Sequence, residues 1–128
     1  MPRYRSKQPL PPWVTATIDG REGRFIQLGN TLLLSKTFLA LNGNAQLLYI
    51  RMVNEAGGKR EFAFTAGDAR KYKMSKGGFA KSLDELKEKG FVECTENNAN
   101  LRKPNMYRFC DSWKSAVAAN LRAPPGNI

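Results

Sequence analysis

The chain has 128 residues, of which 41% are hydrophobic, and this length and composition suit one folded domain rather than a disordered polymer. Lys and Arg number 21 against 11 Asp and Glu, and the resulting net charge of +10 favours a polyanionic partner, either nucleic acid or an anionic membrane surface. The sequence has no histidine, which removes the commonest general base and metal ligand. No carboxylate pair or glycine-rich phosphate loop stands out, so we expect no enzyme, no metal and no cofactor.

The sequence also bears on the cellular compartment. No run approaches the roughly 18 apolar residues of a membrane span, and the opening MPRYRSKQPLPPW lacks the apolar stretch of a secretory signal. We therefore expect a cytoplasmic protein with no membrane partner. Cys94 and Cys110 are too few for a disulfide scaffold, and a hairpin centred near Asn100 would place Cys94 opposite Tyr107, so we expect two free thiols.

Proline marks the predicted domain boundaries. All seven prolines lie near the two ends or in one loop, and residues 13–103 contain none. We expect a flexible, basic, proline-rich arm over residues 1–12, a single domain over 13–121 and a tail over 122–128.

The first part of the predicted domain carries two alternating runs. TATID at 15–19 and RFIQL at 24–28 alternate polar and apolar residues, which predicts two strands joined by a turn. A short helical piece should follow, beginning at Asn30 or Ser35.

A longer helix is predicted after the Asn42-Gly43 break, with Asn44 as its cap. The run AQLLYIRMVNEA at 45–56 is apolar on most sides, which is typical of a central buried helix. Gly57-Gly58 should end it, and the alternation of KREFAF at 59–64 predicts a short strand or an extended linker that enters the next helices.

Residues 65–90 predict two helices joined by a tight turn. Thr65 and Asp68 have the spacing of a capping box at the start of the first helix. Lys73-Met74 would make the turn, and Ser75 would cap the second helix. The buried side of the first helix is expected to comprise Ala69, Tyr72 and Met74.

The second helix of this pair has an apolar stripe and a polar face. Phe79, Leu83 and Leu86 follow at i, i+4 and i+7, and Gly90 suits the position just past the helix end. The opposite face is expected to present small and basic residues: Lys76, Gly77, Lys81 and Ser82.

A β-hairpin with a long polar tip is predicted next. FVECTE at 91–96 and MYRFCD at 106–111 alternate on either side of the loop NNANLRKPN. Asp111 should cap a final helix, SWKSAVAANL, whose Trp113 packs back onto the domain.

This order of elements resembles a winged helix-turn-helix domain. DARKYKMSKGGFAKSLDELKEKGFVE and the loop NNANLRKPN carry the resemblance. FIQLGNTLLLSKTFLALNGNAQLLYIRM looks more loosely like the lead-in of winged-helix domains of plasmid replication initiators and of phage and mobile-element proteins. The resemblance implies an α+β fold with a three-helix core, a helix-turn-helix at 65–90, a wing at 91–110, an N-terminal extension and a C-terminal helix. Lys73 departs from the glycine common in this turn, which costs roughly 1 kcal/mol at positive φ.

Charge is sorted along this region. Residues 70–81 hold five cations and no acid, whereas residues 84–96 hold five acids against two lysines. A merely soluble pair of helices more often mixes its signs, although a plain helical hairpin with a solvated face is the alternative interpretation.

The resemblance and the charge together imply double-stranded DNA as the partner. The second helix would enter the major groove, and the wing would reach the minor groove or the backbone. The basic N-terminal arm could lie along the backbone or in a minor groove. The alternatives are a frayed first turn at Gly77-Gly78 and a solvated loop at Arg102 and Lys103. The residues expected to contact DNA are Arg70, Lys71, Lys73, Ser75, Lys76, Gly77, Gly78, Lys81, Ser82, Asn98, Asn100, Arg102 and Lys103, with Arg3, Arg5 and Lys7 from the arm.

Base discrimination by one copy should be modest, because no Arg, Asn or Gln sits on the exposed first two turns of the second helix. A homodimer would restore specificity by reading two half-sites, and Trp13 and Trp113 are candidates either for that contact or for the core. The function we expect is a transcriptional regulator or an accessory factor of replication or of a mobile element. The alternative is a winged-helix module that binds RNA or another protein.

Overall fold

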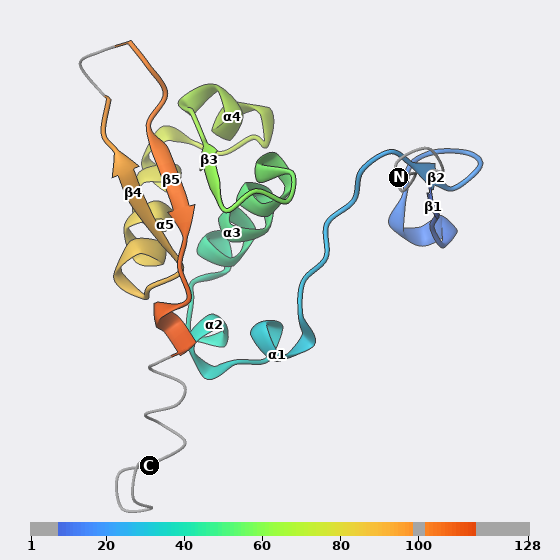
Figure 1. Cartoon of the computed structure of the whole chain (residues 1–128), viewed down its shortest axis with the longest axis horizontal. Coiled ribbons are helices and arrows are strands. Elements are labelled where there is room, and N and C mark those ends of the chain that lie inside the picture. Colours follow the sequence, from blue (N-terminus) through green and yellow to red (C-terminus); the bar gives the residue numbers. More distant parts are fainter. Residues whose placement is uncertain (1–7, 99–101, 115–128) are drawn as a thin grey trace, which may run out of the picture.

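The computed structural model describes residues 8–98 and 102–114, which form an α+β fold (Figure 1). Its elements in chain order are β1 Gln8–Pro9, a 3-10 helix Pro12–Val14, β2 Arg21–Glu22, α1 Asn30–Leu33, α2 Lys36–Leu39, α3 Gly43–Ala56, β3 Glu61–Ala63, α4 Ala66–Lys71, α5 Lys76–Glu88, β4 Val92–Glu96 and β5 Met106–Phe109. None of the helices in these two ranges has both the length and the apolar character needed to cross a bilayer.

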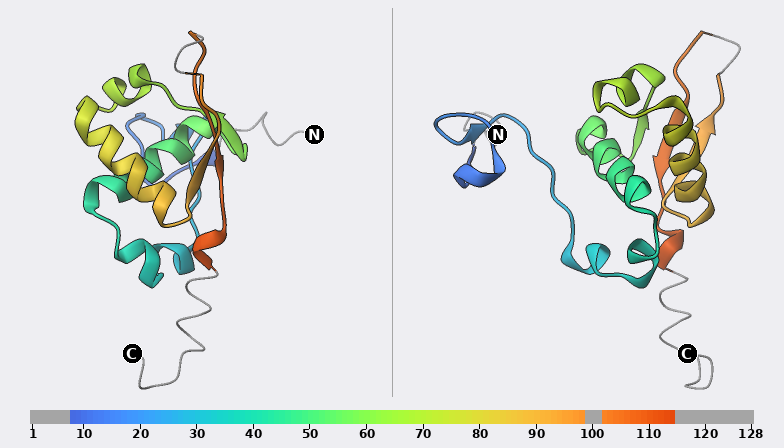
Figure 2. Two further views of the ribbon diagram at one scale, coloured as in Figure 1. Left: turned by 90° about the vertical axis from the view of Figure 1, so that its left-hand side faces the viewer. Right: turned by 180° about the vertical axis from the view of Figure 1, so that it is seen from behind.

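A three-stranded antiparallel sheet lies on one side of the helices. Its strand order is β3-β5-β4, so that the predicted hairpin β4–β5 is confirmed and the predicted strand after Gly58 pairs with it. Cys94 faces Tyr107 across the hairpin, as expected, and Cys94 and Cys110 are free thiols. Seen along the sheet, α3 and α5 cover one of its faces (Figure 2, left).

The core is built around α3 and a set of aromatic side chains. Leu48 and Met52 of α3 are fully buried, which confirms this helix as the central one. Phe91 meets Tyr49 edge-on with ring centroids 5.5 Å apart, and Trp113 stacks on Phe91 at 5.3 Å. Trp113 therefore belongs to the core of its own chain, whereas Trp13 is 82% exposed.

The predicted strands at 15–19 and 24–28 are wrong. Side-chain hydrogen bonds shape the first of these segments instead: the Thr15 hydroxyl donates to the Glu22 carboxylate, and Asp19 accepts from the Arg21 amide at 3.1 Å. Such local bonds compete with a strand ladder. Residues 24–28 have no regular secondary structure, and the strand that forms, β2, pairs with β1 at the end of the predicted arm.

The helix starts were predicted with one error. Ser35 caps α2 as expected, accepting from the Phe38 amide at 3.1 Å. Asn42 caps α3 in place of Asn44, because its side-chain oxygen accepts from the Asn44 amide at 2.8 Å. The Asn42-Gly43 pair is thus the helix start itself, consistent with the preference for Asn at this position. The final helix begins at Ser112, and its residues from 115 onward lie outside the described range.

Candidate nucleic-acid interface

Local hydrogen bonds fix the connection between α4 and α5. The Thr65 hydroxyl accepts from the Asp68 amide at 3.1 Å and the Asp68 carboxylate accepts from the Thr65 amide at 2.9 Å, which confirms the capping box. Lys73 has φ 65°, the left-handed conformation expected for the turn. Ser75 then caps α5 by accepting from the Gly78 amide at 3.0 Å, so the start of α5 has a fixed geometry.

The outward face of α5 differs from the prediction at one residue. Lys76, Gly77 and Lys81 are exposed, as expected. Ser82 is only 4% exposed, which is a correction to its expected place on this face. It lies three residues after Phe79 and four before Leu86, so the helical period puts its side chain on the buried stripe.

Ala80 also belongs to the outward face, although the sequence pattern did not lead us to predict it. It is exposed and lies three residues after Gly77, on the same side of α5. The helical spacing alone could have identified it. Gly77 and Ala80 add only small groups to this face between its lysines; a Cβ at Gly77 would meet nothing within 4 Å. Gly78 is half-buried, and a Cβ there would lie 2.8 Å from the Ser75 hydroxyl, so its small size preserves the cap.

The two cations of α4 differ: among the described residues Arg70 has no carboxylate partner, whereas Lys71 has one. Arg70 is exposed. Lys71 forms an ion pair with Glu55 of α3, whose carboxylate also accepts from the Tyr72 hydroxyl at 2.7 Å. These two bonds lower the pKa of Glu55, and the same carboxylate raises the pKa of Lys71. The expected phosphate contact of Lys71 therefore competes with an existing partner.

Asn98, at the start of the hairpin tip, was predicted to contact DNA but forms hydrogen bonds within the protein. The Asn98 side chain is 8% exposed and donates to the Pro104 carbonyl at 3.0 Å and to Glu96 at 3.3 Å. These bonds hold the two ends of the tip together and occupy the side chain that was expected to contact DNA. Arg102 and Lys103 are exposed. Asn100 of the tip and Arg3, Arg5 and Lys7 of the arm lie outside the described residues.

The outer end of the hairpin and α4 lie at the same end of the molecule in Figure 1 and in both views of Figure 2. The start of α5 is joined to α4 by the short turn at 72–75. The helix pair and the hairpin tip together carry six exposed cations: Arg70, Lys73, Lys76, Lys81, Arg102 and Lys103. We call this set the end cluster.

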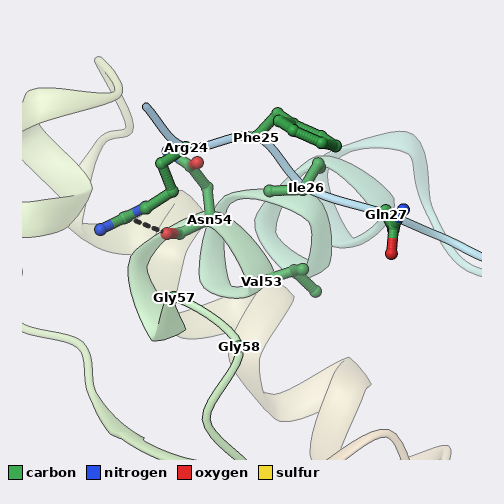
Figure 3. A pocket seen from close by; sticks show the side chains of 8 residues that line it. All are labelled: Arg24, Phe25, Ile26, Gln27, Val53, Asn54, Gly57 and Gly58. Carbon is green, nitrogen blue, oxygen red and sulfur yellow. Dashed lines mark hydrogen bonds between the residues drawn. The ribbon is translucent and has the colours of Figure 1, made fainter. Parts of the chain in front are cut away.

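Three hollows lie along α3. One of about 370 Å³ separates the segment 24–27 from the end of α3, where the Arg24 guanidinium donates to the backbone oxygen of Asn54 (Figure 3). A second, of about 450 Å³, lies between α3 and the turn at 72–75, and a third, of about 590 Å³, lies between the N-terminal segment and α3.

Within residues 8–98 and 102–114, no three His, Cys, Asp or Glu side chains gather in a way that could hold a metal ion. No family model, curated protein or solved structure matches the chain.

Proposed function

We propose that the protein is a winged helix-turn-helix domain that binds double-stranded DNA, with α5 in the major groove and the β4–β5 hairpin on the minor groove or backbone. It would serve as a transcriptional regulator or as an accessory factor of replication or of a mobile element. The fold is compatible with this proposal: three helices, α3, α4 and α5, stand beside a sheet that ends in a hairpin.

The observation that carries the proposal is the outward face of α5. This face begins at a capped N-terminus and exposes small residues next to cations: Gly77 and Ala80 beside Lys76 and Lys81. Small side chains let the helix backbone approach base edges, and an exposed alanine methyl suits contact with thymine methyl groups. The lysines supply attraction for phosphates or for guanine acceptors.

The end cluster sets the expected salt dependence. It contains six exposed cations, and each phosphate that is neutralised contributes about −0.9 to the slope of log affinity against log salt. A slope of roughly −5 would reduce affinity about 10³-fold over a fourfold rise in salt.

The test is a titration of labelled duplex DNA followed by fluorescence anisotropy at two salt concentrations. Lys76→Glu with Lys81→Glu should abolish binding while leaving the melting temperature nearly unchanged, because both side chains are exposed. Lys36→Glu with Lys59→Glu is the matched control, since it makes the same change in net charge on exposed residues outside the end cluster. Equal losses in the two variants would mean that net charge alone drives binding.

A parallel titration with double-stranded RNA separates the proposal from an RNA-binding role. RNA has a deep, narrow major groove that an α-helix cannot read, so we expect weaker binding than to DNA. Equal or tighter binding to RNA, or no salt-dependent shift with duplex DNA at low micromolar protein, would overturn the proposal.

A further inference from the structure

The two larger hollows meet at a shared pair of residues. Arg51 of α3 and Tyr72, at the end of α4, line both the 450 Å³ hollow beside the turn and the 590 Å³ hollow beside the N-terminal segment. The two hollows therefore adjoin at these residues, and the pair of hollows extends from Lys73 and Ser75 past Arg51 to Arg24 and Phe25. We call it the N-terminal groove.

The N-terminal groove is cationic. Arg24, Arg51 and Lys73 line it, and Glu22 is the one acid among the described residues of its lining. The Glu22 carboxylate accepts a hydrogen bond from the Thr15 hydroxyl. The excess of positive charge favours an anionic occupant.

Aromatic side chains lie along the same groove. Phe25 lines it and is 42% exposed. Trp13 is 82% exposed and precedes Val14, which also lines the groove. The Arg51 guanidinium lies 5.3 Å from the centroid of the Tyr72 ring. Exposed rings and a guanidinium placed over an aromatic ring are surfaces on which unpaired nucleobases stack.

We propose that the N-terminal groove binds single-stranded nucleic acid, with phosphates on Lys73, Arg51 and Arg24 and bases stacked on Phe25 and on the Arg51 guanidinium. A duplex keeps its bases stacked inside, so it offers no base face to these groups, whereas an unpaired strand does. The inference rests on the proposed function, because the groove begins at Lys73 of the end cluster. The ligand it fits is a DNA duplex that carries a single-stranded extension.

The experiment compares three labelled ligands by anisotropy: a blunt duplex, the same duplex with an overhang of about ten thymidines, and the thymidine strand alone. Stacking contributes about 1–3 kcal/mol per base, so one stacked base should make the overhang duplex bind at least fivefold tighter than the blunt one. Phe25→Leu keeps an apolar side chain but removes the ring, and it should lose most of this advantage without changing the blunt-duplex affinity. Leu39→Ala, which alters an exposed apolar residue of α2, is the matched control.

Trp13 provides a second readout. It is exposed while Trp113 is buried, so acrylamide quenching of the chain reports mainly on Trp13. The overhang duplex should protect Trp13 from the quencher, and the blunt duplex should not.

The outcomes separate the two proposals. Equal affinity for the blunt and overhang duplexes in the unmodified protein would overturn the groove, while the duplex proposal would stand. Binding of the thymidine strand without binding of the blunt duplex would support the groove and overturn the duplex proposal. An overhang advantage that survives Phe25→Leu and leaves Trp13 unprotected would place the single strand elsewhere and overturn the groove.

Discussion

In the proposed complex with DNA, Glu55 should limit the affinity by holding Lys71. The Glu55 side chain is 16% exposed and lies between the Lys71 ammonium and the Tyr72 hydroxyl. The Tyr72 hydroxyl also accepts from the Asn54 side-chain amide at 2.8 Å, so the carboxylate is held in place by a network. Lys71, whose side chain is 56% exposed, would have to leave this carboxylate to neutralise a phosphate.

Glu55→Gln is the perturbation that releases Lys71. Glutamine keeps the shape of the side chain and an oxygen that can accept from Tyr72, but it removes the negative charge. One additional phosphate contact should steepen the slope of log affinity against log salt by about 0.9. Relative to 1 M salt, this corresponds to roughly 15-fold tighter binding at 50 mM and about 4-fold at 200 mM.

The assay is a salt titration of the dissociation constant for four proteins: unmodified, Glu55→Gln, Lys71→Gln and the double variant. Lys71→Gln should change the slope little by itself, because its charge is already paired, and it should cancel the gain in the Glu55→Gln background. Glu61→Gln, at an exposed carboxylate of β3, controls for the change in net charge. An unchanged slope in Glu55→Gln, or an equal increase in Glu61→Gln, would refute the reasoning.

Three further predictions concern two glycines and the pH dependence of the Glu55 contribution. Gly90→Ala should lower the free energy of unfolding by about 1–2 kcal/mol or more in urea denaturation, because Gly90 has φ 85° and a new Cβ would lie 2.9 Å from that of Ser112; an unchanged midpoint would contradict this packing. Gly77→Ala should stabilise α5 by up to about 1 kcal/mol but weaken duplex binding, and tighter binding would mean that this face does not approach DNA. Because the pKa of Glu55 is lowered below its usual 4.5 by folding, its stabilising contribution is complete above that value and is lost as the pH falls through the lower folded pKa. Urea midpoints should therefore decline less steeply with acidification in Glu55→Gln, and identical pH profiles would show that Glu55 does not contribute.

The helix pair and the hairpin could be predicted because their signals are local. The capping box of Thr65 and Asp68, the Ser75 cap and the turn residue Lys73 each depend on neighbours within four positions. The hairpin follows from alternation on both sides of a polar loop, and its length fixed the pairing of Cys94 with Tyr107.

The features that were missed depend on distant or atypical partners. The ion pair of Lys71 joins residues 16 positions apart on two helices, and no sequence period marks it. Ser82 is a buried polar residue on the apolar stripe of α5. Its polar side chain led to the prediction that it is exposed, whereas helical spacing places it on the buried side. The segment 15–19 alternates like a strand, yet its threonine hydroxyls bond to each other and to Glu22, and the Asp19 carboxylate accepts from the Arg21 amide.

The end residues of α4 favour helix formation, whereas those at the start of α5 oppose it. This contrast supports a functional role for α5. α4 begins with the acidic cap partner Asp68 and ends with Arg70 and Lys71, the arrangement that the helix dipole favours. α5 has a lysine and two glycines and no acid in its first turn, so its start opposes both the dipole and helix propensity. Gly78 is explained by the Ser75 cap, but no neighbour within 4 Å requires a glycine at position 77. Local rules are broken most often where a site has a function, and the start of α5 is the surface that the proposed DNA contact uses.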